Sequence, residues 1–178
     1  MKKIIALALA LAMVFALCAC GSSSAPAASD ASASSGEKVV KIGVFEPTSG
    51  DSAAGGKKEV LGMQYANKET PTVDVNGETY KVELVLADNG SSTDKAPSAA
   101  SELVSKGVSV VLGTYGSGCA IAGGPKFDEG GLAAIGVTCT NPNVTAGNDY
   151  YFRICFLDDF QANVLASFAI DKFDAKVA

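Results

Sequence analysis

The chain has 178 residues, with 14 Lys and Arg against 19 Asp and Glu and no histidine, which leaves a net charge of −5 at pH 7. This acidic balance argues against nucleic acid as a partner, because nucleic-acid binding depends on clustered Lys and Arg. Without histidine or a C-x-x-C spacing, the chain lacks the usual ligands of a structural zinc site. We therefore expect neither a metal nor another cofactor.

The first residues have the pattern of a secretion signal. Lys2 and Lys3 precede the apolar run Ile4–Leu17, which is too short to span a membrane as a helix. The run closes on LCACG, which resembles the bacterial lipobox, with a small residue directly before Cys20. Cleavage there makes residues 1–19 a lipoprotein signal peptide and Cys20 the lipidated N-terminus. The alternative is a plain signal peptide, cut at an A-x-A-like site, which gives Cys20 no role.

A tether and one folded region follow the signal. Residues 20–36 are mostly Gly, Ser, Ala and Pro without apolar periodicity, so we expect them to stay flexible. The folded region starts near Glu37, and its length of about 140 residues suits one core but not two. The final Lys176-Val177-Ala178 has the pattern of another strand's start. We therefore expect residues 37–178 to form a lobe that is incomplete at its C-terminus.

The first half of the folded region predicts a strand, a helix and a hairpin. The apolar run Lys38–Phe45 predicts the strand. After a small-residue loop, Asp51–Gly56, helical spacing of apolar residues predicts a helix over Lys57–Glu69. Pro71–Asp88 alternates apolar and polar residues around Asn76-Gly77, a strong hairpin signal.

The next segments predict a strand–helix–strand unit. Ser91–Lys106 has candidate N-cap residues and Pro97 early enough for a first turn, so it predicts a helix. The short apolar runs Val108–Leu112 and Leu132–Val137 indicate buried parallel strands, and Cys119–Glu129 is long enough for the crossover helix between them.

The last segments predict one more strand and helix. Tyr150–Phe156 indicates a strand with Arg153 facing out of an apolar run. Asp158–Phe173 predicts a helix that Asp158 or Asp159 caps and that packs through one apolar face. Strands and helices that alternate in this way predict an α/β fold with a doubly wound parallel sheet.

Two loops should meet at the carboxyl ends of neighbouring strands, where open α/β sheets bind small ligands. They are Gly113–Gly118 and Thr138–Asn143. The Ser117 hydroxyl and the amides at the start of the following helix suit a carboxylate, which a helix N-terminus favours. The Thr138 carbonyl and the Thr140 hydroxyl can accept hydrogen bonds from an ammonium group. The alternatives are Ser117 as a helix N-cap and the two threonines as turn-forming hydroxyls.

Other chemistry lacks support in the sequence. The glycine-rich stretch Gly50–Lys58 departs from a P-loop in its lysine and hydroxyl positions, and no acid, base or nucleophile constellation stands out. An enzyme is therefore not expected. A disulfide between Cys119 and Cys139 is geometrically feasible, but we favour small buried thiols.

Five blocks of sequence, in their order and spacing, resemble the extracytoplasmic solute-binding proteins of branched-chain amino acid ABC transporters, the leucine-binding protein family. The blocks are KIGVFEPTSG (Lys41–Gly50), VLADNGS (Val85–Ser91), VVLGTYGSGCAIA (Val110–Ala122), GVTCTNP with VT two residues on (Gly136–Thr145) and YYFRICFLDDFQ (Tyr150–Gln161). The resemblance runs from Lys38 to the end of the chain. It implies the N-terminal lobe of a two-lobe, type I periplasmic-binding-protein fold, with the second lobe missing.

The resemblance also implies roles for individual residues. Ser117 matches a serine that binds the ligand's α-carboxylate, with the Gly116 and Gly118 backbone beside it. Thr138 and Thr140 match residues that bind ammonium and carboxylate, and Asp158 matches an aspartate near the site. This sequence departs from the family's pattern at two positions. Gly55 stands where relatives offer an aromatic side chain, and Gly116 stands where some have a disulfide cysteine.

The expected function is that of a lipid-anchored receptor that captures an amino acid or related zwitterion and delivers it to an ABC permease, outside the cell membrane. The alternatives are an extracellular ligand-sensing domain with the same fold and, less favoured, a secreted α/β enzyme. The residues that would select one solute over another are not recognisable in the sequence.

Overall fold

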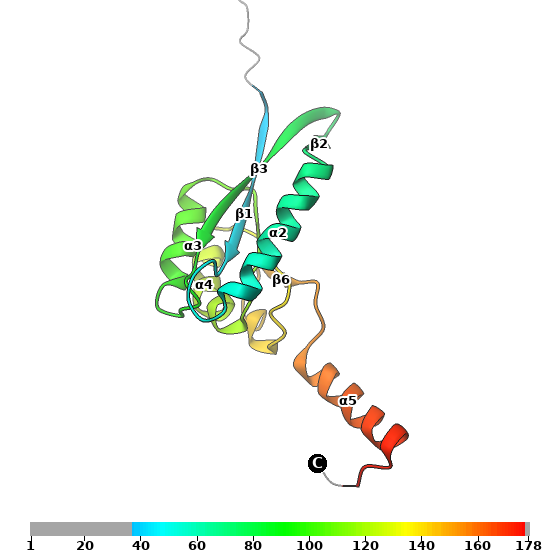
Figure 1. Cartoon of the computed structure of the whole chain (residues 1–178). Helices are drawn as coiled ribbons and strands as arrows, with labels where there is room; N and C mark the ends of the chain where they lie inside the picture. The colour runs from blue at the N-terminus through cyan, green and yellow to red at the C-terminus, as the bar shows by residue number, and fades with distance from the viewer. Residues whose placement is uncertain (1–36, 177–178) are drawn as a thin grey trace, which may run out of the picture. The chain divides into compact units, whose positions relative to one another are not determined.

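The computed structural model describes residues 37–176 (Figure 1). Helices and strands follow one another in the order β1 (Val39–Glu46), α2 (Ala53–Glu69), β2 (Thr72–Val75), β3 (Glu78–Asp88), α3 (Ala96–Ser105), β4 (Val110–Leu112), α4 (Ser117–Glu129), β5 (Ala134–Gly136), the 3₁₀ turn η1 (Pro142–Val144), β6 (Tyr151–Arg153) and α5 (Asp158–Phe173). The predicted signal peptide, Cys20 and the tether lie outside the described residues. Of the helices in residues 37–176, none is long and apolar enough to cross a membrane.

One six-stranded sheet carries the fold, in the order β2-β3-β1-β4-β5-β6. Every neighbouring pair is parallel except β2 and β3, which form the predicted antiparallel hairpin. Its turn residues, Asn76 and Gly77, have the positive φ angles of 52° and 81° that this tight turn requires. The arrangement confirms the predicted α/β class with a mostly parallel sheet.

One face of the sheet packs against α3 and α4 and forms the hydrophobic core. Phe45 of β1 meets Phe127 of α4 edge to face, with 5.3 Å between ring centroids. Leu103 of α3 is fully buried beside them. Gly43 is tightly packed, because an added Cβ would come within 3.2 Å of Leu103 and Val108. Tight packing on this face sets the distance between the helices and the sheet.

The opposite face of the sheet lies beside α2. The alternate residues of each strand point here, among them Ile42, Leu84 and Leu112, which line a cavity together with α2. Gly56 is the single buried residue of α2, and Leu61 is 65% exposed. The helix therefore covers this face only in part.

Two helices begin at other residues than predicted. α2 starts at Ala53, not Lys57, because the amides of Ala53 and Gly56 already bond to the carbonyls of Gly50 and Ser52. Gly56 allows this early start, since a Cβ there would lie 2.2 Å from the Pro47 carbonyl oxygen.

α3 starts at Ala96 and not at Ser91. Ser91 has a positive φ of 57°, which a helix cannot contain. Its hydroxyl instead bridges two other loop residues, accepting from the Ser52 amide at 2.9 Å and donating to the Ser49 carbonyl at 2.9 Å. Pro97 lies in the first turn, as predicted.

The last helix has the predicted bounds but not the predicted packing. None of the residues of α5 is buried, and Phe160, Leu165 and Phe168 are all more than half exposed. The N-cap is Leu157, so Asp158 and Asp159 occupy the first turn and do not cap it. Periodicity in the sequence identifies the apolar face of a helix, but it does not show whether another element packs against that face. Within residues 37–176, no element buries the apolar face of α5.

Candidate functional site

The carboxyl ends of β1, β3 and β4 bring together buried polar groups. Glu46, Asn89 and Thr114 are the fully buried polar or charged residues of the described chain, and all three follow or end a strand on this edge. The Asn89 side-chain amide donates to the Thr114 hydroxyl at 2.8 Å. Buried polar groups are costly unless they are paired, so their gathering marks this edge as the candidate site.

Ser117 lies where the predicted carboxylate site requires it, in the first turn of α4. Gly116, with a φ of 106°, is the N-cap, and no side chain caps the helix. The alternative of Ser117 as the N-cap is therefore wrong. The Ser117 hydroxyl accepts from the Asn141 amide at 3.2 Å, which ties α4 to the loop after β5. Its own proton remains available for another acceptor.

The structure brings the other predicted residues to the same edge. The Thr138 hydroxyl donates to Oε1 of Glu59 on α2 at 2.6 Å. The Thr140 carbonyl accepts from the Asp158 amide at 3.1 Å, so the start of α5 adjoins this loop. Within residues 37–176 the Thr140 hydroxyl has no hydrogen-bond partner. The Thr138 hydroxyl thus bonds to a residue of α2 and not to a group within its own turn.

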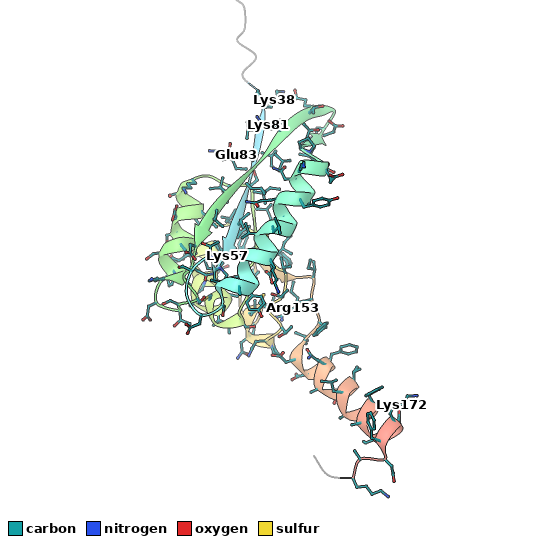
Figure 2. The ribbon with its side chains drawn as sticks, viewed as in Figure 1. Lys38, Lys57, Lys81, Glu83, Arg153 and Lys172 are labelled. Atoms are coloured by element: carbon teal, nitrogen blue, oxygen red, sulfur yellow. The ribbon has the colours of Figure 1, made fainter. Side chains whose placement is uncertain are left out.

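Arg153 has a role that the sequence did not reveal. We expected this side chain to face outward, but it is half-buried at the end of the sheet from which α5 departs (Figure 2). Its guanidinium donates to the carbonyls of Cys139, Asn141 and Pro142 and to the Thr145 hydroxyl, at 3.0–3.2 Å. The forked donors of arginine suit several acceptors at once, so Arg153 holds the loop that carries Thr138 and Thr140.

Asp88, at the end of β3, holds the loop after β1. Its Oδ1 accepts from the amides of Thr48 at 2.8 Å, Ser49 at 3.3 Å and Gly90 at 2.8 Å. Desolvation by itself raises the pKa of Asp88, but the hydrogen bonds from Ser49, Gly90 and Thr48 outweigh it and lower the pKa. The ionised carboxylate therefore stabilises this loop.

Tyr115 takes the space beside Gly55 at the start of α2. A Cβ added to Gly55 would lie 2.5 Å from the tyrosine ring, so a larger side chain there would displace the ring. The ring is 42% exposed. An aromatic wall is thus present where we expected none, but it comes from the loop after β4.

The carboxyl group of Glu46 lies beneath Tyr115. Its Oε2 accepts from the Tyr115 amide at 2.8 Å, and the residue is completely buried. Burial, together with a hydrogen bond to and repulsion from Glu59, raises the pKa of Glu46 to about 9. A glutamic acid that keeps its proton at neutral pH therefore lies under the site.

A large apolar cavity lies beside the strand-end loops. A cavity of about 620 Å³ opens between α2 and the sheet. Apolar side chains dominate its lining, which includes Met63, Leu84 and Ile154, with Glu59 at the border. The lining of this cavity, within residues 37–176, does not include Ser117, Thr138 or Thr140, although Glu59 belongs to it and bonds to Thr138. Binding at the strand-end loops of Ser117, Thr138 and Thr140 stays a prediction.

The three cysteines within residues 37–176 are free thiols. Cys119 and Cys139 are buried and Cys155 is half-buried. Burial is the main cause that raises the pKa of Cys139 to about 11, which leaves the thiol protonated and unreactive. No disulfide joins Cys119 and Cys139. No group of three metal-binding side chains occurs among residues 37–176.

The chain matches known proteins over most of the described region. Residues 39–178 match the family model described as periplasmic binding protein. The Leu/Ile/Val-binding protein homolog 1 of Brucella abortus is 32% identical over 142 residues, which are 78% of this chain and 38% of the relative.

Two solved structures are similar in fold. The leucine binding protein LivK of Thermotoga maritima has a TM-score of 0.70 and 35% identity, over 78% of this chain and 39% of that one. The second is the branched-chain amino acid transporter substrate binding protein LivJ of Streptococcus pneumoniae, solved in complex with isoleucine. It has a TM-score of 0.69 and 31% identity, over 78% of this chain and 40% of that one. The chain thus spans about two fifths of the length of these relatives. It belongs to the periplasmic binding protein family.

Proposed function

We propose that the chain is the N-terminal lobe of a solute receptor that binds a free amino acid and serves an ABC importer. The observation that carries the proposal is the position of Ser117, in the first turn of α4 at the carboxyl edge of the sheet, with an uncommitted hydroxyl proton. A hydroxyl and helix N-terminal amides together favour a carboxylate. The similar proteins from Thermotoga and Streptococcus, by their names, bind leucine and isoleucine.

In this proposal the zwitterion lies across the two loops at the edge. Its carboxylate bonds to Ser117 and the amides that flank it, at Gly116 and Gly118. Its ammonium group bonds to oxygen atoms of Thr138 and Thr140, and Asp158 adds a negative charge nearby. The Tyr115 ring, exposed beside Gly55, supports the aliphatic side chain. Binding and release involve no covalent step, and a second lobe closes over the ligand and excludes water.

We also propose a lipid anchor, a tether and a membrane partner. Residues 1–19 are removed, Cys20 carries the lipid at the outer face of the cell membrane, and residues 20–36 connect the anchor to the lobe. The lipobox-like LCACG supports this proposal. The lobe then delivers its ligand to the permease of an ABC importer.

The carboxylate contact is tested by NMR titration of the full chain, which detects weak binding to one lobe. Leucine should shift the amide signals around Ser117, and leucinamide, which lacks the carboxylate, should not. Ser117→Ala should weaken leucine binding by about 1–3 kcal/mol, because a charged acceptor loses a donor. Ser105→Ala, at an exposed serine on α3, is the matched control. Equal shifts with leucine and leucinamide would contradict the carboxylate role.

The anchor is tested by separating membranes from medium after expression in a bacterium. Wild type should partition into detergent, and Cys20→Ala should appear in the medium or remain uncleaved. Cys18→Ala is the matched control and should behave as wild type. If Cys20→Ala and wild type partition alike, Cys20 does not carry the anchor.

A further inference from the structure

We propose that Glu46 and Glu59 form an acid pair that shares one proton, and that the charge left on Glu59 orients the Thr138 hydroxyl so that its lone pairs accept from the ligand's ammonium group. Glu59 is thus a positioning residue for the amino end of the ligand. The ligand role rests on the proposed amino-acid binding, whereas the acid pair itself does not.

Each carboxyl group of the pair has one oxygen that is bonded and one that is not. Glu46 accepts from the Tyr115 amide through Oε2, and Glu59 accepts from the Thr138 hydroxyl through Oε1. The other two oxygens, Oε1 of Glu46 and Oε2 of Glu59, are buried without a donor from any other described group. Two buried acceptors of this kind would each be costly, unless a proton lies between them.

A shared proton completes the network. It converts the two unpaired oxygens into a donor and an acceptor, and a side-chain hydrogen bond between Glu46 and Glu59 contributes to the raised pKa of Glu46, after burial. Glu46 is the member that keeps the proton, because it is fully buried whereas Glu59 is half-buried at the border of the cavity. Two carboxylates this close cannot both ionise cheaply.

Among the ion pairs of residues 37–176, none involves Glu46 or Glu59. The groups that act on Glu46 are the Glu59 side chain from α2 and the Tyr115 amide from the loop after β4. Tyr151 faces Glu46 from β6. The Tyr151 hydroxyl donates to the Gly113 carbonyl at 3.1 Å. The pKa of Tyr151 is raised by burial first, then by Cys139 and Glu46, so this group stays neutral. The pair therefore holds a single negative charge at neutral pH.

The negative charge on Glu59 determines which hydrogen bonds Thr138 can form with a ligand. A hydroxyl has one proton and two lone pairs, and the Thr138 proton is committed to Glu59. The exposed side of Thr138 therefore presents only acceptors, which suit an ammonium group and repel a carboxylate. The chain of bonds from Tyr115 through Glu46 and Glu59 to Thr138 also joins the aromatic wall to the amino end of the site.

The acid pair is tested by urea unfolding of the full chain between pH 5 and 9.5. The raised pKa of Glu46 means that the folded state binds one proton more than the unfolded state, whose glutamate titrates near 4.5. The unfolding constant should therefore rise roughly ten-fold per pH unit across this window, until pH reaches the folded value. Stability is thus highest at the acidic end and is lost as pH rises.

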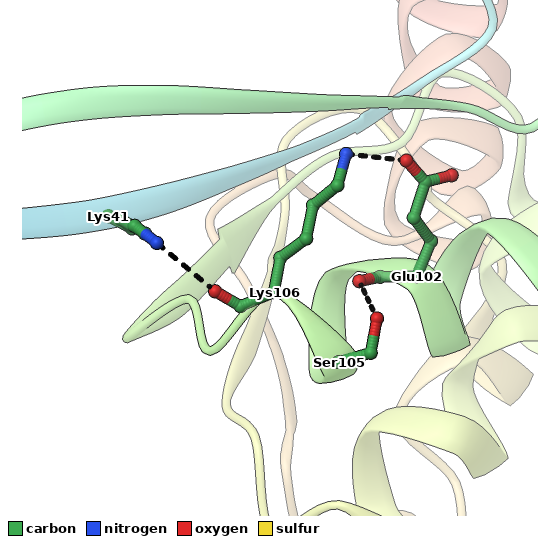
Figure 3. A network of polar contacts seen from close by, with 4 residues as sticks. All are labelled: Lys41, Glu102, Ser105 and Lys106. Carbon is green, nitrogen blue, oxygen red and sulfur yellow. Dashed lines mark hydrogen bonds and ion pairs between the residues drawn. The ribbon is translucent and has the colours of Figure 1, made fainter. Parts of the chain in front are cut away.

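Two variants should change this profile. In Glu46→Gln the amide replaces the protonated acid and cannot ionise, so the slope should be lost. In Glu59→Gln the new amide donates to Glu46 and removes the repulsion, so the slope should end at a lower pH, although burial still raises the pKa of Glu46. Glu102→Gln, at an exposed glutamate that pairs with Lys106 on α3 (Figure 3), is the matched control and should keep the wild-type slope. A flat wild-type profile, or variants with the wild-type profile, would overturn the acid pair.

The ligand role is tested with leucine and 4-methylpentanoate, which has the same carboxylate and side chain but no ammonium group. By NMR titration at pH 7, Glu59→Ala, which removes the acceptor of the Thr138 proton, should weaken leucine binding roughly ten-fold and change 4-methylpentanoate binding less than about two-fold. Equal losses for both ligands would overturn the positioning role, because they would show general damage to the site. If wild type binds neither ligand, the proposed function fails together with this role, and the pH profile still decides the acid pair.

Discussion

The sheet face beneath α3 and α4 is closed, whereas the face beside α2 leaves a cavity of about 620 Å³. Both faces are built from the same strands, and both carry apolar residues, such as Phe45 on one face and Ile42 on the other. The difference comes from the helices. α3 buries Ala96, Ala99, Ala100 and Leu103, while α2 begins with Ala-Ala-Gly-Gly-Lys-Lys and buries only Gly56. Small residues at helical spacing bring α3 close to the sheet, and α2 has too few apolar residues to do the same.

This difference means that the stability of the lobe comes mainly from one side of the sheet. The strand-end site lies at the edge where both faces meet, and its loops are held by polar contacts from Asp88, Arg153 and Glu59. The closed face therefore supports the site, while the open face contributes little. Substitutions on the two faces should have unequal effects.

The largest effect is expected in the closed face. Phe127→Ala should lower the free energy of unfolding by about 3–5 kcal/mol, because it leaves a cavity between Phe45 and Tyr151. Leu61→Ala on α2 should cost less than about 1 kcal/mol, since this side chain is 65% exposed. Urea unfolding at pH 7 measures both. Similar costs would show that the two faces contribute alike.

A smaller effect is expected for Arg153→Lys. The lysine keeps the charge but cannot reach the three carbonyls and the Thr145 hydroxyl that Arg153 bonds. We expect a loss of about 1–2 kcal/mol in the free energy of unfolding. Amide exchange should rise in the loop of residues 138–145 more than in α3. Unchanged exchange in that loop would show that Arg153 does not hold it.

The smallest effect is expected at Asp88 and depends on pH. Because hydrogen bonds lower the pKa of Asp88 in the fold, its contribution is present above the unfolded value of 3.8 and is lost as pH falls through the folded value. Asp88 is largely exposed, so we expect less than about 1 kcal/mol. Asp88→Asn should remove this acid-side loss in urea unfolding between pH 5 and 2. An identical acid profile for the variant and wild type would contradict the assignment.

The order of the elements was predictable from local patterns. Apolar runs, alternation and helical spacings located each strand and α-helix, and Asn76-Gly77 located the hairpin. The meeting of Ser117 with the loop of Thr138 and Thr140 followed from topology alone, because the carboxyl ends of adjacent parallel strands share one edge. These features depend on residues close in sequence, or on the order of strands, and both can be read from a single chain.

The missed features depend on contacts between distant residues. Glu46 ends an apolar strand and gave no sign of its burial, because its partner Glu59 lies on a different element. Arg153 was expected outside, since its position in an apolar run does not show which carbonyls are near. The apolar face of α5 was visible in the sequence, but its exposure within residues 37–176 was not. The spacing of apolar residues shows which face of a segment can be buried. Only the folded structure shows which residues from other elements contact that face.

The central claim is that an amino acid binds at the strand-end edge and not in the apolar cavity beside α2. The most direct test is an NMR titration of the full chain with leucine, in which amide shifts are mapped onto the structure. We predict the largest shifts at Ser117, Thr138 and Thr140, with little change at Met63 and Leu84, which line the cavity. The largest shifts at Met63 and Leu84, with none at Ser117, would contradict the claim.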